Sequence, residues 1–405
     1  MFRITDTFRS EKEGYITIPT LRRFLKDVMN TSMKALDNRE SLIKKIEEYA
    51  DINEENNEKV LSWVDDVLKE GIKDIYVKKI KCDLVLNKIL KNPEKLEEKL
   101  NPSVIKGMNG HFCGNQYNKK LGFVGYSFNI SEKNGDYISI QAGELLEISD
   151  IKGNHYSTIL PMCIDIYIDL GLIVVKAKSK SNMYQYMGNE FDLSKATRTT
   201  TEKEINKAIE KINRIFGFEI QTEEWNFNNN LYNLLEKYTE TPQVIKDSMM
   251  NKNNEIEIIC RSILENICGI SHNYYDDIKA DVENMVEKYF SISYNDKDIF
   301  INDRDAYPLK IAATDEEDSK VEQIAGFQEP LQSKAVFFDN KKMMQKSRLC
   351  DGIYFKFNRK DDRYITDKMF NVKIVAKGSL CIFKFSEYTF EEDINNVLFS
   401  LIKAV

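Results

Sequence analysis

Several residues and motifs on which common enzyme classes depend are scarce or missing in this sequence of 405 residues. There are three histidines, and no GxSxG, Walker A, GxGxxG or HExxH motif occurs. These motifs supply the nucleophile, the phosphate cradle or the zinc ligands of large enzyme classes. We therefore do not expect serine hydrolysis, ATP hydrolysis or zinc proteolysis.

The sequence also lacks a disulfide framework and any long apolar run. Its seven cysteines are scattered, and no CxxC pair occurs. An odd, dispersed set is typical of reduced thiols in a cytosol. No stretch reaches ~18 apolar residues, and residues 1–9 have no apolar run of the kind that signal peptides contain. We expect a cytoplasmic protein with no membrane span.

What the sequence does contain is ordinary for a folded protein. Hydrophobic residues make up 42% and charged residues 30%, so a disordered chain is not expected. The length predicts two or three domains, and the net charge of -7 excludes a uniformly basic surface. Lysine outnumbers arginine 46 to 12, and Asn, Ile and Tyr are plentiful. This bias favours A+T-rich codons, and we infer a bacterial or mobile-element genome.

Hydrophobic periodicity predicts an α+β fold in four regions. These are a mainly helical N-terminal region (1–101), a central β region (120–181), a helical block (202–290) and a C-terminal α/β region (291–405). The central sheet is expected to be largely antiparallel, because hairpin turns separate its strands. In the last region we expect a solvated acidic loop at 296–318. Strands are expected at 335–339, 352–358, 370–376 and 380–385, and a helix at 390–402.

The central region ends in a predicted hairpin, HYSTILPMCIDIYIDLGLIVVKAKSKS (155–181). Strands at 159–169 and 172–178 would be joined by a tight turn at Leu170-Gly171, since glycine accepts the positive φ that such turns need. In that register Asp165 lies opposite Lys176. Lys176, Lys178 and Lys180 share a face at period two.

An Asp on one strand and a Lys on the next resembles the metal-dependent nucleases of the PD-(D/E)xK class. The resemblance implies that Asp165, Asp169 and Lys176 are catalytic and that two carboxylates hold Mg²⁺. Val174 stands where the class has its second carboxylate, so Glu144 or Glu147 would have to supply one, and a degenerate relative is the alternative. The simpler interpretation is a cross-strand ion pair on a half-exposed face. No cofactor is expected outside the nuclease alternative.

Candidates for nucleic-acid binding lie mainly in the C-terminal region. Residues 276–329 hold fifteen acidic and six basic side chains, whereas residues 331–384 hold five acidic and thirteen basic ones. Basic groups bind phosphates and exposed aromatic rings stack on bases. The alternative is that the aromatic residues of this segment face a core. The candidates are Lys334, Lys341, Lys342, Lys346, Arg348, Lys356, Arg359, Lys360 and Arg363, with Lys178 and Lys180 from the central region.

A second basic segment, TLRRFLKDVMNTSMKALDNRESLIKKIEEY (20–49), predicts two helices joined by a short link. It resembles a SAP module, a DNA-binding helix–extended-loop–helix unit. The resemblance implies phosphate contacts from Arg22, Arg23, Lys44 and Lys45. The glycine usual between the helices is absent, and a generic helical hairpin is the alternative.

The sequence therefore favours a nucleic-acid-binding protein, for DNA rather than RNA, that acts in a complex with a protein partner or with further copies of itself. Its inferred origin suggests a role in bacterial defence against phage. Two alternatives stay open: a Mg²⁺-dependent nuclease, more plausibly degenerate than active, and an adaptor that binds proteins without catalysis.

Overall fold

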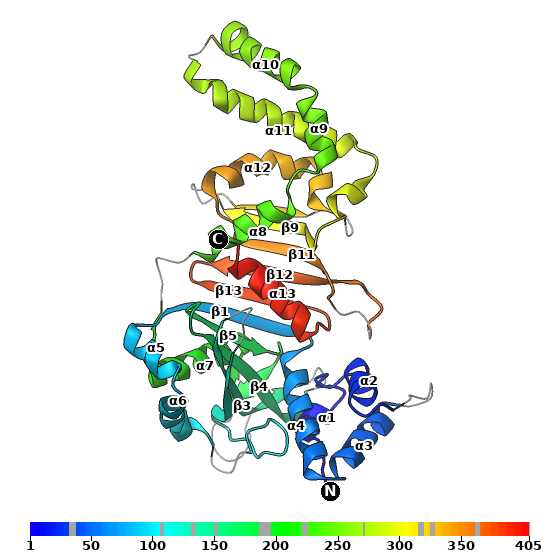
Figure 1. Cartoon of the computed structure of the whole chain (residues 1–405), viewed down its shortest axis with the longest axis vertical. Helices are drawn as coiled ribbons and strands as arrows, with labels where there is room; N and C mark the ends of the chain where they lie inside the picture. The colour runs from blue at the N-terminus through cyan, green and yellow to red at the C-terminus, as the bar shows by residue number, and fades with distance from the viewer. Residues whose placement is uncertain are drawn as a thin grey trace. The chain divides into compact units, whose positions relative to one another are not determined.

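The chain forms two compact units, each assembled from three stretches. The computed structural model describes residues 1–31, 38–105, 109–130, 135–149, 153–185, 196–220, 226–269, 272–314, 320–324, 329–360 and 365–404 (Figure 1). The first unit comprises residues 1–225, 359–368 and 379–396, and the second comprises 226–358, 369–378 and 397–405. Both combine an antiparallel sheet with helices, which confirms the predicted α+β class.

The first unit is built on a sheet in the order β13-β1-β5-β4-β3-β6-β7, in which β2 also pairs with β3 and β8 with β1. The bounds of its strands are β1 (Lys73–Lys81), β2 (Gly122–Asn129), β3 (Tyr137–Ser149), β4 (His155–Tyr167), β5 (Leu172–Ala177), β6 (Met183–Gln185), β7 (Thr197–Thr199), β8 (Glu219–Ile220) and β13 (Leu380–Phe385). Its helices are α1 (Asp6–Arg9), α2 (Ile18–Asp27), α3 (Arg39–Ala50), α4 (Glu54–Lys69), α5 (Leu84–Leu90), α6 (Pro93–Leu100), α7 (Thr201–Phe216) and the first turns of α13 (Glu391–Ile402).

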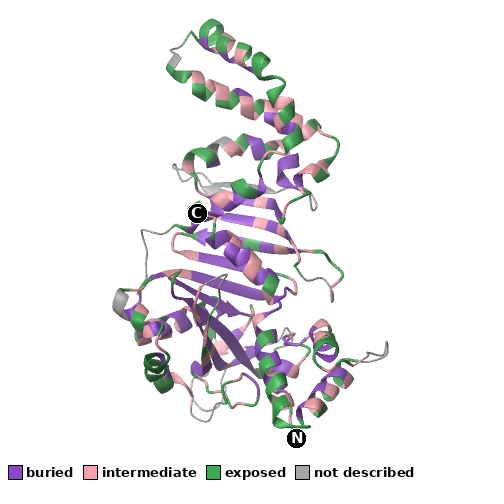
Figure 2. Cartoon of the chain, viewed as in Figure 1, coloured by how far each residue is buried: buried purple, intermediate pink, exposed green. Residues whose placement is uncertain are grey.

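Helices cover both faces of this sheet (Figures 1 and 2). Successive side chains of a strand point to opposite faces. Ile164 and Ile166 of β4 therefore join a core that α5, α6 and α7 close, whereas Cys163 joins the core of α1 to α4. Burial on both faces explains why β4 is so nearly apolar. A charged residue of β4 on the α4 side, such as Asp165, thus faces a protein interior.

The predicted hairpin of residues 155–181 is present as β4 and β5, but its register is not the predicted one. Cys163 lies opposite Lys176, and Asp165 lies opposite Val174. The reason is that the connection spans residues 168–171 rather than the two-residue turn at Leu170-Gly171. A shift of two positions keeps each side chain on its face. Asp165 and Lys176 therefore still share one face, as predicted.

The second unit contains a sheet in the order β10-β9-β11-β12, with α8 packed on β9, β11 and β12. The bounds of its strands are β9 (Ala306–Thr314), β10 (Lys320–Ile324), β11 (Gly352–Asn358) and β12 (Met369–Lys377). Its helices are α8 (Phe227–Tyr238), α9 (Gln243–Met250), α10 (Asn253–Arg261), a π-helical continuation at Ser262–Cys268, α11 (Tyr275–Ser293) and α12 (Ala335–Ser347). Across the described ranges of both units, no helix has the length and apolar character needed to cross a membrane.

The C-terminal predictions are partly confirmed. Strands at 352–358, 370–376 and 380–385 are present, and the final helix runs from Glu391 to Ile402. The expected strand at 335–339 is wrong, because these residues begin α12. The buried side chains of α12, Phe337, Phe338 and Met344, recur at helical spacing. The acidic stretch 296–318 is not simply a loop, since β9 lies within it.

Candidate functional site

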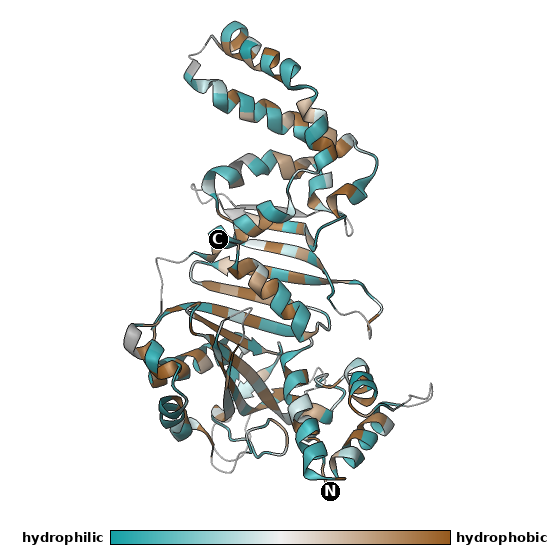
Figure 3. Cartoon of the chain, viewed as in Figure 1, coloured by the Kyte–Doolittle hydropathy of each residue, from teal (hydrophilic) through white to brown (hydrophobic). Residues whose placement is uncertain are grey.

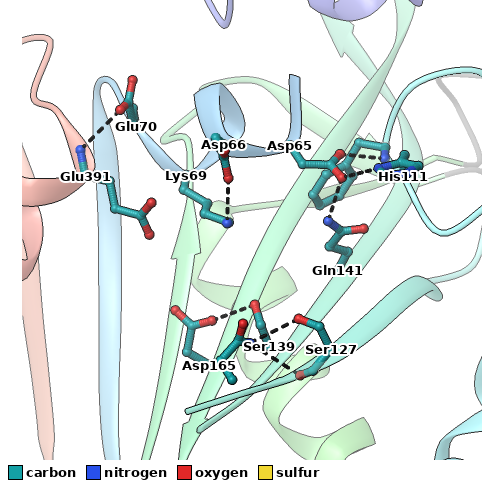
Figure 4. Close-up of polar contacts among 12 residues, drawn as sticks. Asp65, Asp66, Lys69, Glu70, His111, Ser127, Ser139, Gln141, Asp165 and Glu391 are labelled. Atoms are coloured by element: carbon teal, nitrogen blue, oxygen red, sulfur yellow. Dashed lines mark hydrogen bonds and ion pairs between the residues drawn. The ribbon is translucent and has the colours of Figure 1, made fainter. Parts of the chain in front are cut away.

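A polar cavity of about 600 Å³ lies in the first unit, between α4, the loop after Gly110, the sheet and the start of α13. Figure 4 shows carboxylates, hydroxyls and amides from these elements directed toward one another. Among the described residues that line it, Ile130 is the one aliphatic side chain. The lining residues are Ser62, Asp65, Asp66, Lys69, Gly110, His111, Tyr126, Ser127, Asn129, Ile130, Tyr137, Ser139, Gln141, Asp165, Tyr167, Glu391 and Asn395.

One side of the cavity is an ionic triad of Asp165, Lys176 and Glu391. The Nζ atom of Lys176 lies 3.1 Å from Oδ2 of Asp165 and 3.3 Å from Oε1 of Glu391. The other oxygen of Asp165 accepts a hydrogen bond from the Ser139 hydroxyl at 2.8 Å. The Lys176 side chain is only 1% exposed. The sequence-predicted ion pair is therefore confirmed, but its expected half-exposed setting is wrong.

The charge of Lys176 is fixed by its two carboxylate neighbours. Burial by itself would lower the pKa of Lys176, because the charged form is poorly solvated in a protein interior. The attraction of Asp165 and Glu391 outweighs this effect, and the pKa lies well above its usual value. Lys176 is therefore a permanent cation that holds β4, β5 and α13 together.

The structure brings two of the predicted catalytic residues, Asp165 and Lys176, together and separates Asp169 from them. Asp169 lies in the connection 168–171, where its Oδ1 pairs with Nζ of Lys91 at 2.6 Å, and it does not line the cavity. Glu144 pairs with Lys207 of α7, while Glu147 accepts a hydrogen bond from Ser157. The second carboxylate near Lys176 is instead Glu391, which lies 215 positions along the chain.

These residues do not fit a Mg²⁺ ion as they are arranged. The ammonium group of Lys176 already pairs with the carboxylates of Asp165 and Glu391, and it supplies the positive charge that a cation would bring. Within the described ranges, no three acidic, histidine or cysteine side chains are grouped so that they could hold a metal ion. We therefore derive no metal-dependent step from this arrangement.

A second polar cluster on the cavity wall surrounds Asp65 of α4. Its carboxylate accepts hydrogen bonds from the backbone N–H of Phe112 at 2.9 Å and from Nε2 of Gln141 at 2.9 Å. It also contacts Nδ1 of His111 at 2.7 Å, and Nε2 of His111 lies 2.9 Å from Glu58. The cluster links α4, the loop 109–115 and β3. Sequence reasoning missed it, because two of its members are separated from His111 by 46 and 53 positions.

The surroundings of His111 favour its charged form. The hydrogen bond to Asp65 is the main cause of a raised pKa, with burial acting in the opposite direction and Glu58 adding to the increase. A general base needs an unprotonated ring nitrogen directed at a substrate. Both nitrogens of His111 face carboxylates, so His111 acts as a structural cation.

Two buried oxygens on the cavity wall are left without a donor. Neither Oε1 of Gln141 nor Oδ1 of Asn395 receives a hydrogen bond from any residue in the described part of the chain. An unpaired buried acceptor costs about 1–3 kcal/mol. Both residues line the cavity, but the two oxygens themselves are inaccessible to solvent, so a bound molecule supplies the missing donors only when these side chains turn toward it.

The structure distributes the predicted nucleic-acid-binding residues over both units, and several already pair with acids. In the second unit, Lys334 pairs with Glu329 and Lys341 pairs with Glu287, whereas Lys346 and Arg348 are exposed and Lys356 is half-buried. In the first unit, Arg359 pairs with Asp393, and Lys360 is exposed. The side chain of Lys342 and the whole of Arg363 lie outside the described residues.

The two candidates from the central region are turned inward. Nζ of Lys178 donates to the backbone carbonyls of Glu13 at 2.6 Å and Gly14 at 2.9 Å. Lys180 pairs with the carboxylate of Glu13, and its side chain is 7% exposed. Burial lowers the pKa of Lys178 to about 8. Neither side chain is placed to contact a phosphate backbone.

The aromatic residues of the C-terminal segment face a core. Phe337, Phe338, Phe355 and Phe357 are buried, which confirms the core interpretation for these rings. Phe357 stacks on Phe370 with centroids 6.0 Å apart. Rings held in this way cannot stack on bases.

The helices of the SAP-like segment are present as α2 and α3, and the link 32–37 lies outside the described residues. Arg23 is not directed at solvent as a phosphate contact requires. Its guanidinium donates to both oxygens of Glu70, at 3.0 and 2.6 Å, and lies 4.7 Å from the ring centroid of Phe390. Lys44 pairs with Glu48 at 3.7 Å.

Searches for similar proteins provide no family assignment: no protein-family model matches this chain, and neither does any curated protein sequence.

Proposed function

We propose that the cavity of the first unit binds a cationic ligand rich in hydrogen-bond donors, of the amine or guanidine type, and that the protein acts by binding rather than by catalysis. The observation that carries the proposal is the acidic, acceptor-rich lining of the cavity, and two unmatched oxygens add to it. Both buried wall atoms that lack a partner among the described residues, Oε1 of Gln141 and Oδ1 of Asn395, are acceptors. Once these side chains turn toward the cavity, an N–H or N⁺–H group satisfies them, whereas a phosphate or carboxylate does not.

The charges and rings of the lining support the same ligand class. Among the described residues, the lining has four carboxylates, Asp65, Asp66, Asp165 and Glu391, against three cations, Lys69 and His111 of the lining and the buried Lys176 that pairs with two of the carboxylates. Tyr137 and Tyr167 stack with their centroids 5.0 Å apart and also line the cavity. Aromatic faces attract cations, and the attraction grows when the cation is desolvated.

Binding without turnover is favoured because the titratable groups are already engaged. Asp165 and Glu391 pair with Lys176, and both ring nitrogens of His111 face carboxylates. A nucleophile or general acid–base pair must be free to exchange a proton with a substrate. This proposal develops the adaptor alternative: the ammonium or guanidinium group could be a small molecule or a side chain of a partner.

A thermal-shift panel on the full chain tests the ligand class. Agmatine and spermidine should raise the melting temperature, whereas inorganic phosphate and glucose should not, because they cannot neutralise the carboxylates and donate N–H groups at once. The variant Asn395→Leu, which removes one unmatched oxygen, should weaken agmatine binding. Asn396→Leu is the control, because Asn396 follows Asn395 in the chain but does not line the cavity.

Stabilisation by phosphate, or no response to either amine at millimolar concentration, would refute the proposal. An equal loss of agmatine binding in Asn395→Leu and Asn396→Leu would also count against it, because only the first change alters the cavity wall.

Nucleic-acid binding is a second candidate, favoured by a groove between α5 and α6. The groove encloses about 510 Å³ and is lined by Lys88, Lys95 and Lys99 with Ile89 and Glu98. The three lysines are exposed, and none of them forms an ion pair with a residue that the structure describes. Unpaired lysines along a groove are what phosphate binding requires. A role in defence against phage would follow from this candidate and from the inferred bacterial origin.

A gel shift with DNA and with RNA, with and without Mg²⁺, tests the second candidate. Binding should fall steeply with salt and should not need Mg²⁺. Replacing Lys88, Lys95 and Lys99 with Gln should abolish the shift. The matched control replaces Lys346, Arg348 and Lys360, the exposed members of the C-terminal set. A shift that only the control variant loses would assign binding to the C-terminal set instead, and no shift for the wild-type chain would rule this candidate out.

A further inference from the structure

The second unit carries a helical hairpin with a very small core. We call residues 253–293, which form α10, its π-helical continuation and α11, the helical arm. The cluster between its helices contains three buried side chains, Ile256, Cys260 and Val282. Ile278 and Val286 are only partly buried against them. Two helices alone therefore do not cover their own apolar residues.

Large apolar side chains of the helical arm are exposed. Ile267 is 74% exposed in the π-helical stretch, and Tyr289 of α11 is 59% exposed. Tyr274 just before α11 and Met285 and Tyr289 within it are exposed, and with the partly buried Ile278 they follow one another at intervals of four, seven and four residues, which places them along one side of the helix. Figure 3 shows apolar positions among the polar ones along both helices. Several large exposed apolar side chains on one helical hairpin mark an interaction surface.

The irregular end of the first helix is consistent with a binding surface. Residues Ser262–Cys268 form a π-helix, which ends at Gly269 with φ 58°. Stretches of π-helix are rare and occur frequently at functional sites. The exposed Ile267 belongs to this stretch.

The charge of the helical arm indicates what covers it. The arm carries eight acidic side chains and three basic ones, and Glu255, Glu265, Asp276, Asp277 and Asp281 are exposed. A second copy of the arm would bring the same negative charge against it, which costs free energy. A partner whose apolar face is flanked by lysine or arginine would gain both apolar burial and charge complementarity.

We propose that the helical arm docks an amphipathic helix of a partner protein, with basic residues flanking the apolar face of that helix. The partner helix lies along the stripe of Tyr274, Met285 and Tyr289 and completes a three-helix bundle with α10 and α11. Recognition of an amphipathic helix by an apolar groove with anchors at helical spacing is a recurring mode of peptide binding. This surface belongs to the second unit and does not depend on the cavity.

Fluorescence anisotropy on the full chain tests the proposal. The probe is a labelled 21-residue helix with leucine on one face and lysine on the flanks. Its counterpart has glutamate in place of every lysine. The lysine peptide should bind and the glutamate peptide should not. The variant carrying Ile267→Ser, Met285→Ser and Tyr289→Ser should bind the lysine peptide at least tenfold more weakly. The control is Ile52→Ser, which changes an equally exposed isoleucine of the first unit.

Equal binding of the lysine peptide by the triple variant and by the control would overturn the proposal, as would binding of both peptides with similar affinity. Sedimentation of the wild-type chain and the triple variant tests whether a second copy of this chain covers the surface instead. A dimer that the triple variant loses would identify a second copy as the partner and would also overturn the proposal. Far-UV circular dichroism establishes that the triple variant remains folded.

Discussion

At the scale of single residues, the buried ammonium of Lys176 links the elements that form one wall of the cavity. It connects two strands with a helix whose carboxylate lies 215 positions away. A buried ion pair does not by itself guarantee stability, because desolvation offsets much of the Coulomb attraction. Removing one partner is nonetheless costly, since it leaves the others charged and unpaired in the interior.

Lys176→Met should therefore lower the free energy of unfolding by about 3–5 kcal/mol. The double variant Lys176→Met, Asp165→Asn should recover part of that loss, because the asparagine is neutral. Urea unfolding measures both, with Lys373→Met as an exposed control that should change stability by no more than about 0.5 kcal/mol. A loss as small in Lys176→Met as in the control would show that the triad is not buried.

His111 makes the stability of the first unit depend on pH. Its pKa is raised in the folded chain, chiefly by the hydrogen bond to Asp65. The stabilisation is therefore complete below the pKa of an unfolded histidine, about 6.5, and is lost as the pH rises through the folded pKa. His111→Gln should cost about 1.5–3 kcal/mol at pH 5.5 and clearly less at pH 9. Urea unfolding at both pH values checks this, and a cost that rises with pH would contradict it.

At the scale of elements, the cavity wall depends on a close approach of two backbones. A Cβ atom on Gly125 would lie 2.7 Å from the carbonyl oxygen of Gly110 and 2.9 Å from its Cα. Gly125 lies where the register of β2 and β3 shifts, and Gly110 lines the cavity beside His111. The loop 109–115 is therefore packed onto β2 only because position 125 has no side chain.

Gly125→Ala should displace this loop, weaken the contact between His111 and Asp65, and lower the free energy of unfolding by about 1–3 kcal/mol. Hydrogen exchange should report faster exchange at the backbone N–H of Phe112, which donates to Asp65. Unchanged protection at Phe112 would contradict this account. Ser157→Ala, at an exposed position of β4, is the control. It should leave hydrogen exchange at Phe112 unchanged.

The elements were predictable where local patterning determines them. The hairpin of β4 and β5 and the shared face of Asp165 and Lys176 follow from alternation, which has a period of two. The predicted register of this hairpin was wrong by two positions. A four-residue connection and a two-residue turn leave the same alternation of side chains between the two faces, so the pattern does not distinguish them. Helix α12 was mistaken for a strand because Phe337 and Phe338 are adjacent apolar residues, and a short apolar run does not distinguish the two structures.

The composition of the cavity was less predictable than its strands. Asp165 and Lys176 could be paired from the sequence, since they belong to one hairpin. Glu391 and Asp65 reach the cavity only through tertiary packing, and no local pattern marks them. The charge of Lys334, Lys341 and Arg359 is visible in the sequence, but the acids that pair with them are not.

At the scale of the whole molecule, the chain passes between its two units five times. Strand β13 pairs with β1, and Glu391 contacts Lys176, although both come from the last 30 residues and their partners from the first 200. The first unit therefore cannot be obtained by cutting the chain once after residue 225.

A truncated chain of residues 1–225 should lack cooperative unfolding, because it loses strand β13, which pairs with β1, and one member of the ionic triad. Thermal denaturation followed by circular dichroism distinguishes the outcomes. The full chain should unfold with a sharp transition, and the truncated chain should not. A sharp transition for residues 1–225 would mean that the later segments add little to this unit.

The central claim, that the cavity accepts a donor-rich cation, is tested most directly by titration calorimetry of agmatine into the full chain. Glu391→Gln removes one carboxylate of the cavity, and Glu392→Gln removes an exposed neighbour that does not line it. We predict that wild type and Glu392→Gln bind agmatine alike, and that Glu391→Gln binds it about tenfold more weakly, a difference of about 1.4 kcal/mol. Equal affinities in all three proteins, or no heat of binding in any, would contradict the claim.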